Sequence, residues 1–334
     1  MTNIAINGFG RIGRNVLKAG INKKGFNIVA INDLTDTKTL AYLLKYDTAY
    51  GLDSVDIKHT KNSLIINGKK IPVFAQKDPE QLPWKDYKVD VVLECTGFFR
   101  TREGSEKHLK AGAKGVIISA PAKSDDIPTH VMGVNHDKIK KSSKIINNAS
   151  CTTNCIVPVM AVLKEKLGIK KAMFSTVHGY TAAQAIQDAP RKDLRRGRAA
   201  AQNVVPTTTG AAIATSKVIK GIDNKFDGVA IRVPVIVGSL IDVTAILKKK
   251  TTVEKINDIF VKASKLSKWK GILATTKDPI VSSDIIGNSY SSTVDLEMTR
   301  VVDGDLVKIF AWYDNEWGYS NRLSELALVF AKNL

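Results

Sequence analysis

Cysteine is scarce in this sequence: Cys95, Cys151 and Cys155 are the only three among 334 residues. So small and odd a number argues against a disulfide framework and favours a reducing compartment. The sequence also lacks CxxC pairs and His/Cys clusters with the spacing of a zinc site, so we expect no bound metal.

Long apolar runs are missing as well. No uncharged apolar stretch approaches the ~20 residues that a membrane-spanning helix requires. The N-terminal MTNIAING has neither a basic region nor a small-residue cleavage site, as a secretory signal would. We therefore expect a cytoplasmic protein with no membrane partner.

Acidic residues are in deficit, with 32 Asp and Glu against 50 Lys and Arg, for a net charge of +18. Such a basic chain either binds nucleic acid or attracts small anions. The lysines are scattered, and no zinc-finger, RNP or basic-zipper pattern is present. We therefore expect no dedicated nucleic-acid partner.

The first 150 residues alternate short β-type runs with helical patterns. Asn67-Gly68 between two apolar runs indicates a hairpin. Alternation of strands and helices predicts an α/β, Rossmann-type doubly wound dinucleotide-binding domain. The strands are expected at 4–7, 27–33, 64–66, 71–74, 89–94, 115–119 and 145–148, and the helices at 11–24 and 37–46.

The second half has longer alternating strands and predicts an α+β catalytic domain with a mostly antiparallel sheet. Asp303-Gly304 indicates another hairpin. Residues 182–203 lack a regular pattern and are too long for an ordinary loop, which favours a functional or interface role. Strands are expected at 172–177, 228–234, 240–247 and 307–312, and helices at 153–167, 210–217, 253–266 and from 316 to the end.

A glycine motif follows the first predicted strand. Gly8 permits a tight turn, Gly10 lets the backbone approach a pyrophosphate, and Gly13 allows close packing of helix on strand. Asp33 lies 33 − 13 = 20 residues after the last of these glycines, at the end of the second strand. Its carboxylate would accept hydrogen bonds from ribose hydroxyls and repel a 2′-phosphate, which favours NAD over NADP.

The segment NASCTTNC opens a predicted helix at Cys151. A thiol at a helix N-terminus is favoured as the reactive thiolate by the helix dipole. Cys155, one turn later, and Cys95 are better explained as small buried side chains.

A nucleophilic cysteine needs a base. His178 ends an apolar strand, where its side chain would be delivered to a site, and it is our candidate base. The other four histidines lie in polar, surface-like contexts or beside turn residues: His59, His108, His130 and His136.

Six segments together resemble the phosphorylating glyceraldehyde-3-phosphate dehydrogenases of the bacterial type. The resemblance runs from residue 4 to the C-terminal helix, and ASCTTNC joined to this Rossmann start is highly specific for the family. It implies oxidation of D-glyceraldehyde 3-phosphate to 1,3-bisphosphoglycerate with NAD and inorganic phosphate, through a hemithioacetal and a thioester on Cys151, with His178 as base. The segments are INGFGRIGR, ASCTTNC, VHGYT, DLRRGRAAAQNVVPTTTGAA, RVPV and WYDNEWGYS.

The resemblance also implies two anion sites, and Arg and Thr side chains are suitable anion donors. The phosphate of the substrate would lie near Thr181 and Arg232. Inorganic phosphate would be held by Ser150, Thr152, Thr209 and Gly210, with Arg196 nearby.

On the cofactor side, the resemblance adds Arg11 and Ile12 at the pyrophosphate, Ser119 near the nicotinamide, Asn315 at the carboxamide and Tyr319 behind the ring. It implies that residues 315–334 complete a dinucleotide-binding domain of residues 1–150, with 151–314 as the catalytic domain. A homotetramer is also implied, in which residues 182–203 reach the cofactor of a neighbouring subunit.

Two positions depart from the family pattern. Lys77 stands where an arginine is usual, which keeps the charge but loses the planar fork. Ala189 precedes Pro190 where NAD-using members commonly have Leu-Pro. We expect NAD as the preferred cofactor and NADP as a weaker alternative.

Two other functions remain open on the sequence. An erythrose-4-phosphate dehydrogenase would use the same cysteine but release a free acid by hydrolysis; Thr152, Thr209 and Arg196 favour phosphorolysis instead. A non-catalytic Rossmann protein that binds RNA or a protein partner would not need Cys151.

Overall fold

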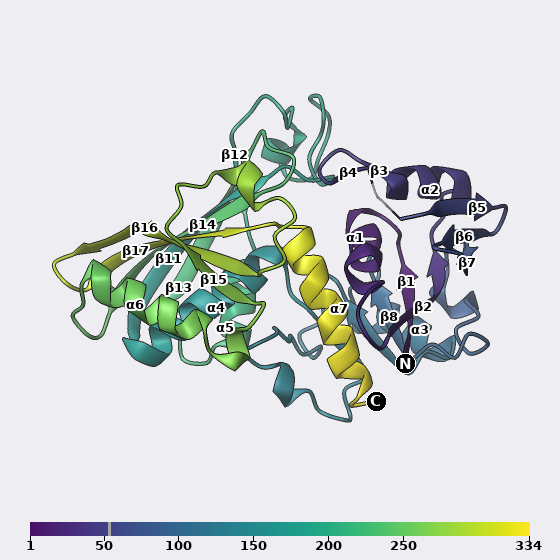
Figure 1. The fold of residues 1–334 in the computed structure, drawn as a ribbon, viewed down its shortest axis with the longest axis horizontal. Helices are drawn as coiled ribbons and strands as arrows, with labels where there is room; N and C mark the ends of the chain where they lie inside the picture. The colour runs from purple at the N-terminus through teal and green to yellow at the C-terminus, as the bar shows by residue number, and fades with distance from the viewer. Residues whose placement is uncertain (53–54) are drawn as a thin grey trace. The chain divides into compact units, whose positions relative to one another are not determined.

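The computed structural model describes residues 1–52 and 55–334, which form two compact units (Figure 1). The first unit comprises Met1–Ala149 together with Ser320–Leu334, and the second comprises Ser150–Tyr319. One helix, α7 (Trp317–Ala331), contributes residues to both units.

The described part of the first unit contains an eight-stranded sheet in the order β10-β9-β8-β1-β2-β7-β6-β5. The strands from β10 to β7 run parallel to their neighbours, and β6 and β5 continue as antiparallel strands. A separate short pair is β3 (Tyr46–Asp47) with β4 (Gly51–Leu52). The bounds are β1 Thr2–Asn7, β2 Phe26–Asn32, β5 Ile57–Thr60, β6 Ser63–Ile66, β7 Lys69–Phe74, β8 Val91–Glu94, β9 Gly115–Ile118 and β10 Ile145–Asn147.

The central strands β1, β8 and β9 of this sheet are buried along most of their length, as their continuous apolar runs predict for parallel strands covered on both faces. Phe330 of α7 is fully buried and approaches Gly115 closely, so the C-terminal helix packs against the start of β9. The other helices are α1 Arg11–Gly20, α2 Thr37–Lys45, α3 Arg102–Lys110, and the 3-10 turns η1 Pro79–Gln81 and η2 His136–Lys138.

The described part of the second unit contains a seven-stranded sheet in the order β12-β13-β11-β14-β17-β16-β15. Its pairs are antiparallel except β11 with β13 and β15 with β16. The bounds are β11 Ile169–Gly179, β12 Val205–Thr208, β13 Phe226–Val233, β14 Ser239–Leu247, β15 Leu273–Thr276, β16 Ser292–Val302 and β17 Leu306–Tyr313.

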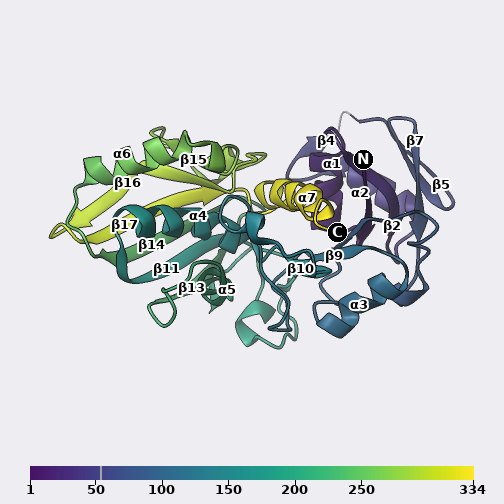
Figure 2. The same cartoon turned by 90° about the horizontal axis from the view of Figure 1, so that it is seen from below.

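Three helices cover one face of this second sheet, α4 (Cys151–Lys166), α5 (Ala211–Val218) and α6 (Val253–Ser264). Figure 2 shows α6 alongside β15 and β16. Ile256 and Phe260 of α6 are fully buried, as the amphipathic pattern of this helix predicts. The remaining turns are η3 Leu194–Gly197, η4 Ser267–Trp269 and η5 Ser282–Ile285.

The predicted fold class is confirmed: a mostly parallel Rossmann-type sheet and a second, mostly antiparallel sheet backed by helices. Several elements differ from the sequence prediction, which did not include helix α3 or strands β5, β12 and β15. The first helix ends at Gly20 rather than near residue 24, because the ring of Phe26 packs directly against Gly20 as the chain turns into β2. Strand β16 was missed because its buried residues include Ser292, Thr293 and Asp295 rather than apolar residues alone.

Among the described residues, no helix combines the length and apolarity needed to cross a bilayer.

Candidate active site

The glycine loop between β1 and α1 requires glycine at two positions. Gly8 has φ +92°, and a Cβ there would stand 2.7 Å from the backbone nitrogen of Thr96. A Cβ on Gly13 would collide with the carbonyl oxygen of Gly8. These contacts give Gly8 and Gly13 the turn and packing roles predicted from the motif.

Gly10 is the N-cap of α1, and this helix start has neither a side-chain cap nor an acidic residue in its first turn. A Cβ on Gly10 would meet nothing within 4 Å, so the backbone is open to a close-approaching group. Unpaired N–H groups at an open helix start suit a phosphate. Beside it lies a cavity of ≈ 540 Å³ lined in part by Gly8, Gly10, Asp33 and Lys77.

Asp33 holds its carboxylate at this cavity through two backbone bonds. One oxygen accepts from the Phe9 N–H at 2.7 Å, and the other accepts from the Thr35 N–H at 2.9 Å. The remaining lone pairs are free to accept ribose hydroxyls. The open helix start and this acidic edge fit a dinucleotide without a 2′-phosphate.

The other predicted cofactor residues have varied surroundings. Arg11 forms an ion pair with Asp47 at 2.6 Å and lies over the ring of Tyr50. Ser119 donates its backbone N–H to the carbonyl of Glu94 at 3.0 Å. Ile12 is in the first turn of α1.

In the second unit, Cys151 is the first residue of α4, and Ser150 is its N-cap. The Ser150 hydroxyl accepts from the Thr153 N–H at 3.1 Å, as an N-cap serine does. The Cys151 Sγ lies 3.4 Å from Nε2 of His178, which is nearly at the end of β11. The structure thus brings the predicted nucleophile and base together.

The Nδ1 atom of His178 has two neighbours that make opposite demands. It lies 2.6 Å from the carbonyl oxygen of Gly179, which only accepts, and 2.7 Å from Nη1 of Arg232, which only donates. Parallel pairing of β11 with β13 places Arg232 opposite His178. A proton on Nδ1, donated to Gly179, leaves Nε2 unprotonated and able to take the thiol proton of Cys151.

Burial governs the charge of both groups. It lowers the pKa of His178 to about 3, with the nearby Arg232 charge acting in the same direction. Burial also raises the pKa of the Cys151 thiol, although the Arg232 charge opposes this. The expected helix-terminus effect is thus outweighed by desolvation, and the resting pair is a neutral thiol beside a neutral imidazole.

Four of the predicted anion-binding residues come from the turn η3, the start of α5 and the segment after β11. Arg196 is held by the Thr207 hydroxyl at 2.9 Å and by Asp193 at 3.3 Å. Thr209 accepts from the Ala211 N–H at 3.2 Å. Gly210 is the N-cap of α5, where a Cβ would meet nothing within 4 Å, and Thr181 is half-buried just after β11.

Sequence reasoning missed Tyr313 and Ser239. The Tyr313 hydroxyl lies 2.9 Å from both the Thr152 and Thr176 hydroxyls, and its ring packs edge-on against His178. Tyr313 lies in the segment WYDNEWGYS, but nothing in the sequence indicates these long-range partners.

Ser239 orients Asn315. The Asn315 Oδ1 accepts from the Ser239 hydroxyl at 2.9 Å and from the Gly238 N–H at 3.1 Å. These two bonds fix the orientation of the Asn315 amide, so that its Nδ2 is left to donate on the opposite side. Tyr319, from the same motif, is buried in α7.

His108 and His130 are buried, although their sequence contexts are polar, surface-like or beside turn residues. His108 is fully buried and His130 is 5% exposed. The partners of His108, Trp84 and Glu94, come from other segments, and the helix of His108 has few apolar positions that would indicate a buried face. Cys155 is buried as predicted, and burial raises its pKa beyond the normal range for a thiol.

Within residues 1–52 and 55–334, no three His, Cys, Asp or Glu side chains are grouped so as to hold a metal ion.

Comparison with known families matches both units. The family model for the NAD binding domain of glyceraldehyde 3-phosphate dehydrogenase matches residues 2–102, and the model for its C-terminal domain matches residues 150–315. The chain is similar to glyceraldehyde-3-phosphate dehydrogenase 1 of Bacillus cereus, with 52% identity over 98% of each chain. It is also similar to the enzymes named glyceraldehyde-3-phosphate dehydrogenase of Thermotoga maritima, with 54% identity over 97% of each chain, and of Geobacillus stearothermophilus, with 51% identity over 98% of each. The resemblance stated from the motifs and the predicted NAD cofactor are confirmed.

Proposed function

The chain belongs to the glyceraldehyde-3-phosphate dehydrogenase family of NAD-dependent enzymes, and on that premise we propose that Cys151 and His178 convert D-glyceraldehyde 3-phosphate to 1,3-bisphosphoglycerate. The observation that carries this proposal is the 3.4 Å contact of the Cys151 Sγ with the His178 Nε2 at the start of α4. The overall conversion consumes aldehyde, NAD⁺ and inorganic phosphate, and yields acyl phosphate, NADH and a proton.

Cys151 acts as the nucleophile on the aldehyde carbon, and His178 Nε2 takes the thiol proton as the C–S bond forms. His178 becomes charged only as the C–S bond forms. This suits a buried pair in which a separate thiolate and imidazolium are disfavoured. The imidazolium of His178 stabilises the negative charge that develops on the aldehyde oxygen and then donates its proton to that oxygen, which gives the hemithioacetal. As hydride leaves the carbon, Nε2 takes the hydroxyl proton back. NAD, when bound, accepts the hydride that leaves this carbon.

The thioester on Cys151 is then cleaved by inorganic phosphate, which forms the new P–O–C bond and releases the thiolate. We assign inorganic phosphate to Ser150, Thr152, Thr209, Gly210 and Arg196. The N-cap position of α5 at Gly210, which has no side chain, and the fixed guanidinium of Arg196 support this assignment. We assign the substrate phosphate to Thr181 and Arg232.

For the cofactor we assign Asp33 to the ribose hydroxyls, the loop from Gly8 to Gly13 to the pyrophosphate and Asn315 to the carboxamide. The oriented Nδ2 of Asn315 supports the last assignment. Arg11, Ile12, Lys77, Ser119 and Tyr319 complete the proposed cofactor set.

The proposed assembly is a cytoplasmic homotetramer. Ile186 and Leu194, in the irregular segment 182–203, are 87% and 83% exposed, and such apolar side chains are suited to contact a second copy of the chain. Sedimentation analysis of the purified protein tests the assembly state, and a monomer at micromolar concentration contradicts it.

The function is tested by NADH formation from glyceraldehyde 3-phosphate with and without phosphate or arsenate. We expect turnover to require the anion and to be more efficient with NAD than with NADP. Turnover without the anion would instead support an erythrose-4-phosphate dehydrogenase type of reaction, and that sugar phosphate is assayed in parallel. Higher kcat/KM with NADP would overturn the cofactor preference.

A further inference from the structure

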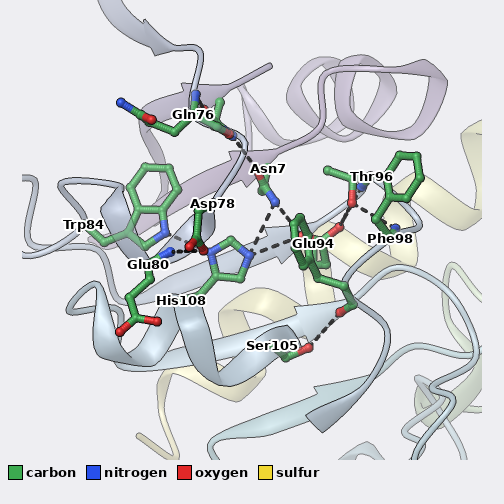
Figure 3. A network of polar contacts seen from close by, with 12 residues as sticks. Asn7, Gln76, Asp78, Glu80, Trp84, Glu94, Thr96, Phe98, Ser105 and His108 are labelled. Carbon is green, nitrogen blue, oxygen red and sulfur yellow. Dashed lines mark hydrogen bonds and ion pairs between the residues drawn. The ribbon is translucent and has the colours of Figure 1, made fainter. Parts of the chain in front are cut away.

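A buried carboxylate, Glu94, ends the central strand β8 and lies within a network of polar contacts (Figure 3). Its Oε1 accepts from both the backbone N–H and the hydroxyl of Thr96. The Thr96 hydroxyl in turn accepts from the Phe98 N–H at 3.0 Å. Thr96 and Phe98 both line the cavity, so the position of this wall depends on the carboxylate.

The other oxygen of Glu94 is held by two side chains. Its Oε2 lies 2.6 Å from Nδ2 of Asn7 and 3.2 Å from Nε2 of His108. The amide of Asn7 can only donate through Nδ2, so its Oδ1 faces away and accepts from Asn32 Nδ2 at 2.7 Å. Asn32 then pairs with the backbone of Gln76 through both of its amide atoms.

The network therefore extends across the ends of β8, β1 and β2 and reaches the segment after β7. Asn7, Asn32, Gln76 and Thr96 all line the cavity. A shift of the Glu94 carboxylate would move side chains on several walls at once, which is the condition under which a residue outside a site changes binding within it.

Trp84 determines the protonation of His108. The Trp84 Nε1 lies 3.0 Å from Nδ1 of His108, and an indole N–H can only donate. His108 Nδ1 must therefore be unprotonated, which puts the ring proton on Nε2, facing Glu94. Trp84 and His108 are fully buried, and neither lines the cavity.

We propose that Trp84 and His108 are positioning residues for NAD: they fix the Glu94 carboxylate, and through it the cavity walls at Thr96 and Asn7. Without the His108 donor, Glu94 keeps its bonds to Thr96 and Asn7, but its Oε2 is held by Asn7 alone. Without the Trp84 donor, the His108 proton can move to Nδ1, which turns a lone pair of Nε2 toward a carboxylate lone pair. The inference depends on NAD as the cofactor of the proposed function.

The direct test is the NAD dissociation constant of purified variants, measured by calorimetry. His108→Leu removes the donor, and we expect Kd to rise about 10- to 100-fold, as for loss of a hydrogen bond to a charged group. His108→Gln offers an amide oxygen to Trp84 and an amide N–H to Glu94, so we expect Kd to return to within about 3-fold of wild type.

Trp84→Phe keeps the aromatic packing but removes the N–H, and it guards against a misfolded leucine variant. We expect its Kd to rise about 5-fold, as for loss of a neutral hydrogen bond. The matched control is His130→Gln, a buried histidine of the same unit whose Nδ1 contacts the backbone of Asn135 rather than the cavity. Its Kd should equal that of wild type.

Steady-state kinetics separate positioning from a general loss of structure. For His108→Leu we expect KM for NAD to rise with Kd, while kcat at saturating NAD and KM for the aldehyde stay within about 3-fold of wild type. Thermal unfolding of each variant is recorded alongside. A lower Tm with an unchanged Kd, or a failure of His108→Gln to restore binding, would overturn the proposal.

These outcomes are distinct from a failure of the proposed function. If wild type binds NAD but forms no NADH in the presence of phosphate, the proposed reaction is wrong while the calorimetric comparison still stands.

Discussion

Two buried histidines occupy very different surroundings in the two units. His108, in the first unit, receives a hydrogen bond from Trp84 on one nitrogen and faces the Glu94 carboxylate with the other. His178, in the second unit, has a carbonyl and a guanidinium competing for one nitrogen and a thiol facing the other. On the first ring the nearest partner of each nitrogen is of matching type, although the Asn7 amide nitrogen also lies 3.4 Å from Nε2. On the second ring the two contacts of Nδ1, at 2.6 and 2.7 Å, conflict.

The difference teaches how burial alone fails to distinguish a structural from a reactive histidine. Matching partners hold the proton of His108 in one place, so that its ring can only transmit position. Around His178 the demands conflict; the pKa lowered to about 3 keeps the ring neutral, and an unprotonated Nε2 then faces the Cys151 thiol. A histidine with contested partners beside a nucleophile is thus the candidate for chemistry.

The largest expected effect comes from removing the nucleophile of the His178 region. For Cys151→Ala we expect turnover to fall by about 10⁴-fold or more, because no other group offers a covalent route. NAD binding, measured by calorimetry, should stay close to wild type because Cys151 is not among the residues that line the cavity. Retained turnover would show that the chain uses another mechanism. Loss of NAD binding would show that the cavity and the Cys151–His178 region do not act independently.

The next effect tests the base. Asn in place of His178 keeps a donor for Gly179 at the position of Nδ1 but has no basic nitrogen near Cys151. We expect His178→Asn to lower kcat by about 10²- to 10⁴-fold. The measurement is the initial rate at saturating substrates, with His130→Gln as control. A kcat close to wild type would show that His178 is structural like His108.

The sequence predicted the His178 region better than the His108 region, for a physical reason. Cys151 and the glycine loop carry local signals: a helix start, and glycines at fixed spacing. The partners of His108 come from segments 14 and 24 residues away, at Glu94 and Trp84, and its helix reads REGSEKHLK, with few apolar positions to indicate a buried face. Tyr313 and Ser239 were missed for the same reason, because their roles arise only when strands far apart in the chain pair.

A third expectation concerns stability in acid. The pKa of His178 is near 3 in the folded protein against 6.5 ordinarily, so between these values the unfolded chain binds a proton that the folded chain does not. Stability contributed by the neutral ring therefore falls as the pH drops from 6.5 toward 3, by about 1.4 kcal/mol per pH unit. His178→Asn should lack this slope. The test compares the unfolding free energies of wild type and His178→Asn at pH 7, 5 and 4, where the two pKa values predict a growing loss. A difference between the two proteins that does not change with pH would contradict the lowered pKa.

The smallest expected effect compares the aromatic neighbours of the two histidines. Trp84 donates to the ring of His108, whereas Tyr313 packs edge-on against His178 and directs its hydroxyl to Thr152 and Thr176. Tyr313→Phe should therefore destabilise the fold by about 1–3 kcal/mol, because two buried hydroxyls lose a partner. It should leave kcat within about 3-fold of wild type, since the ring contact with His178 is retained. Denaturant unfolding and initial rates are measured on the same preparation. A large fall in kcat with unchanged stability would mean that the Tyr313 hydroxyl acts on the Cys151–His178 pair, and the two aromatic neighbours would then be alike in controlling their histidines.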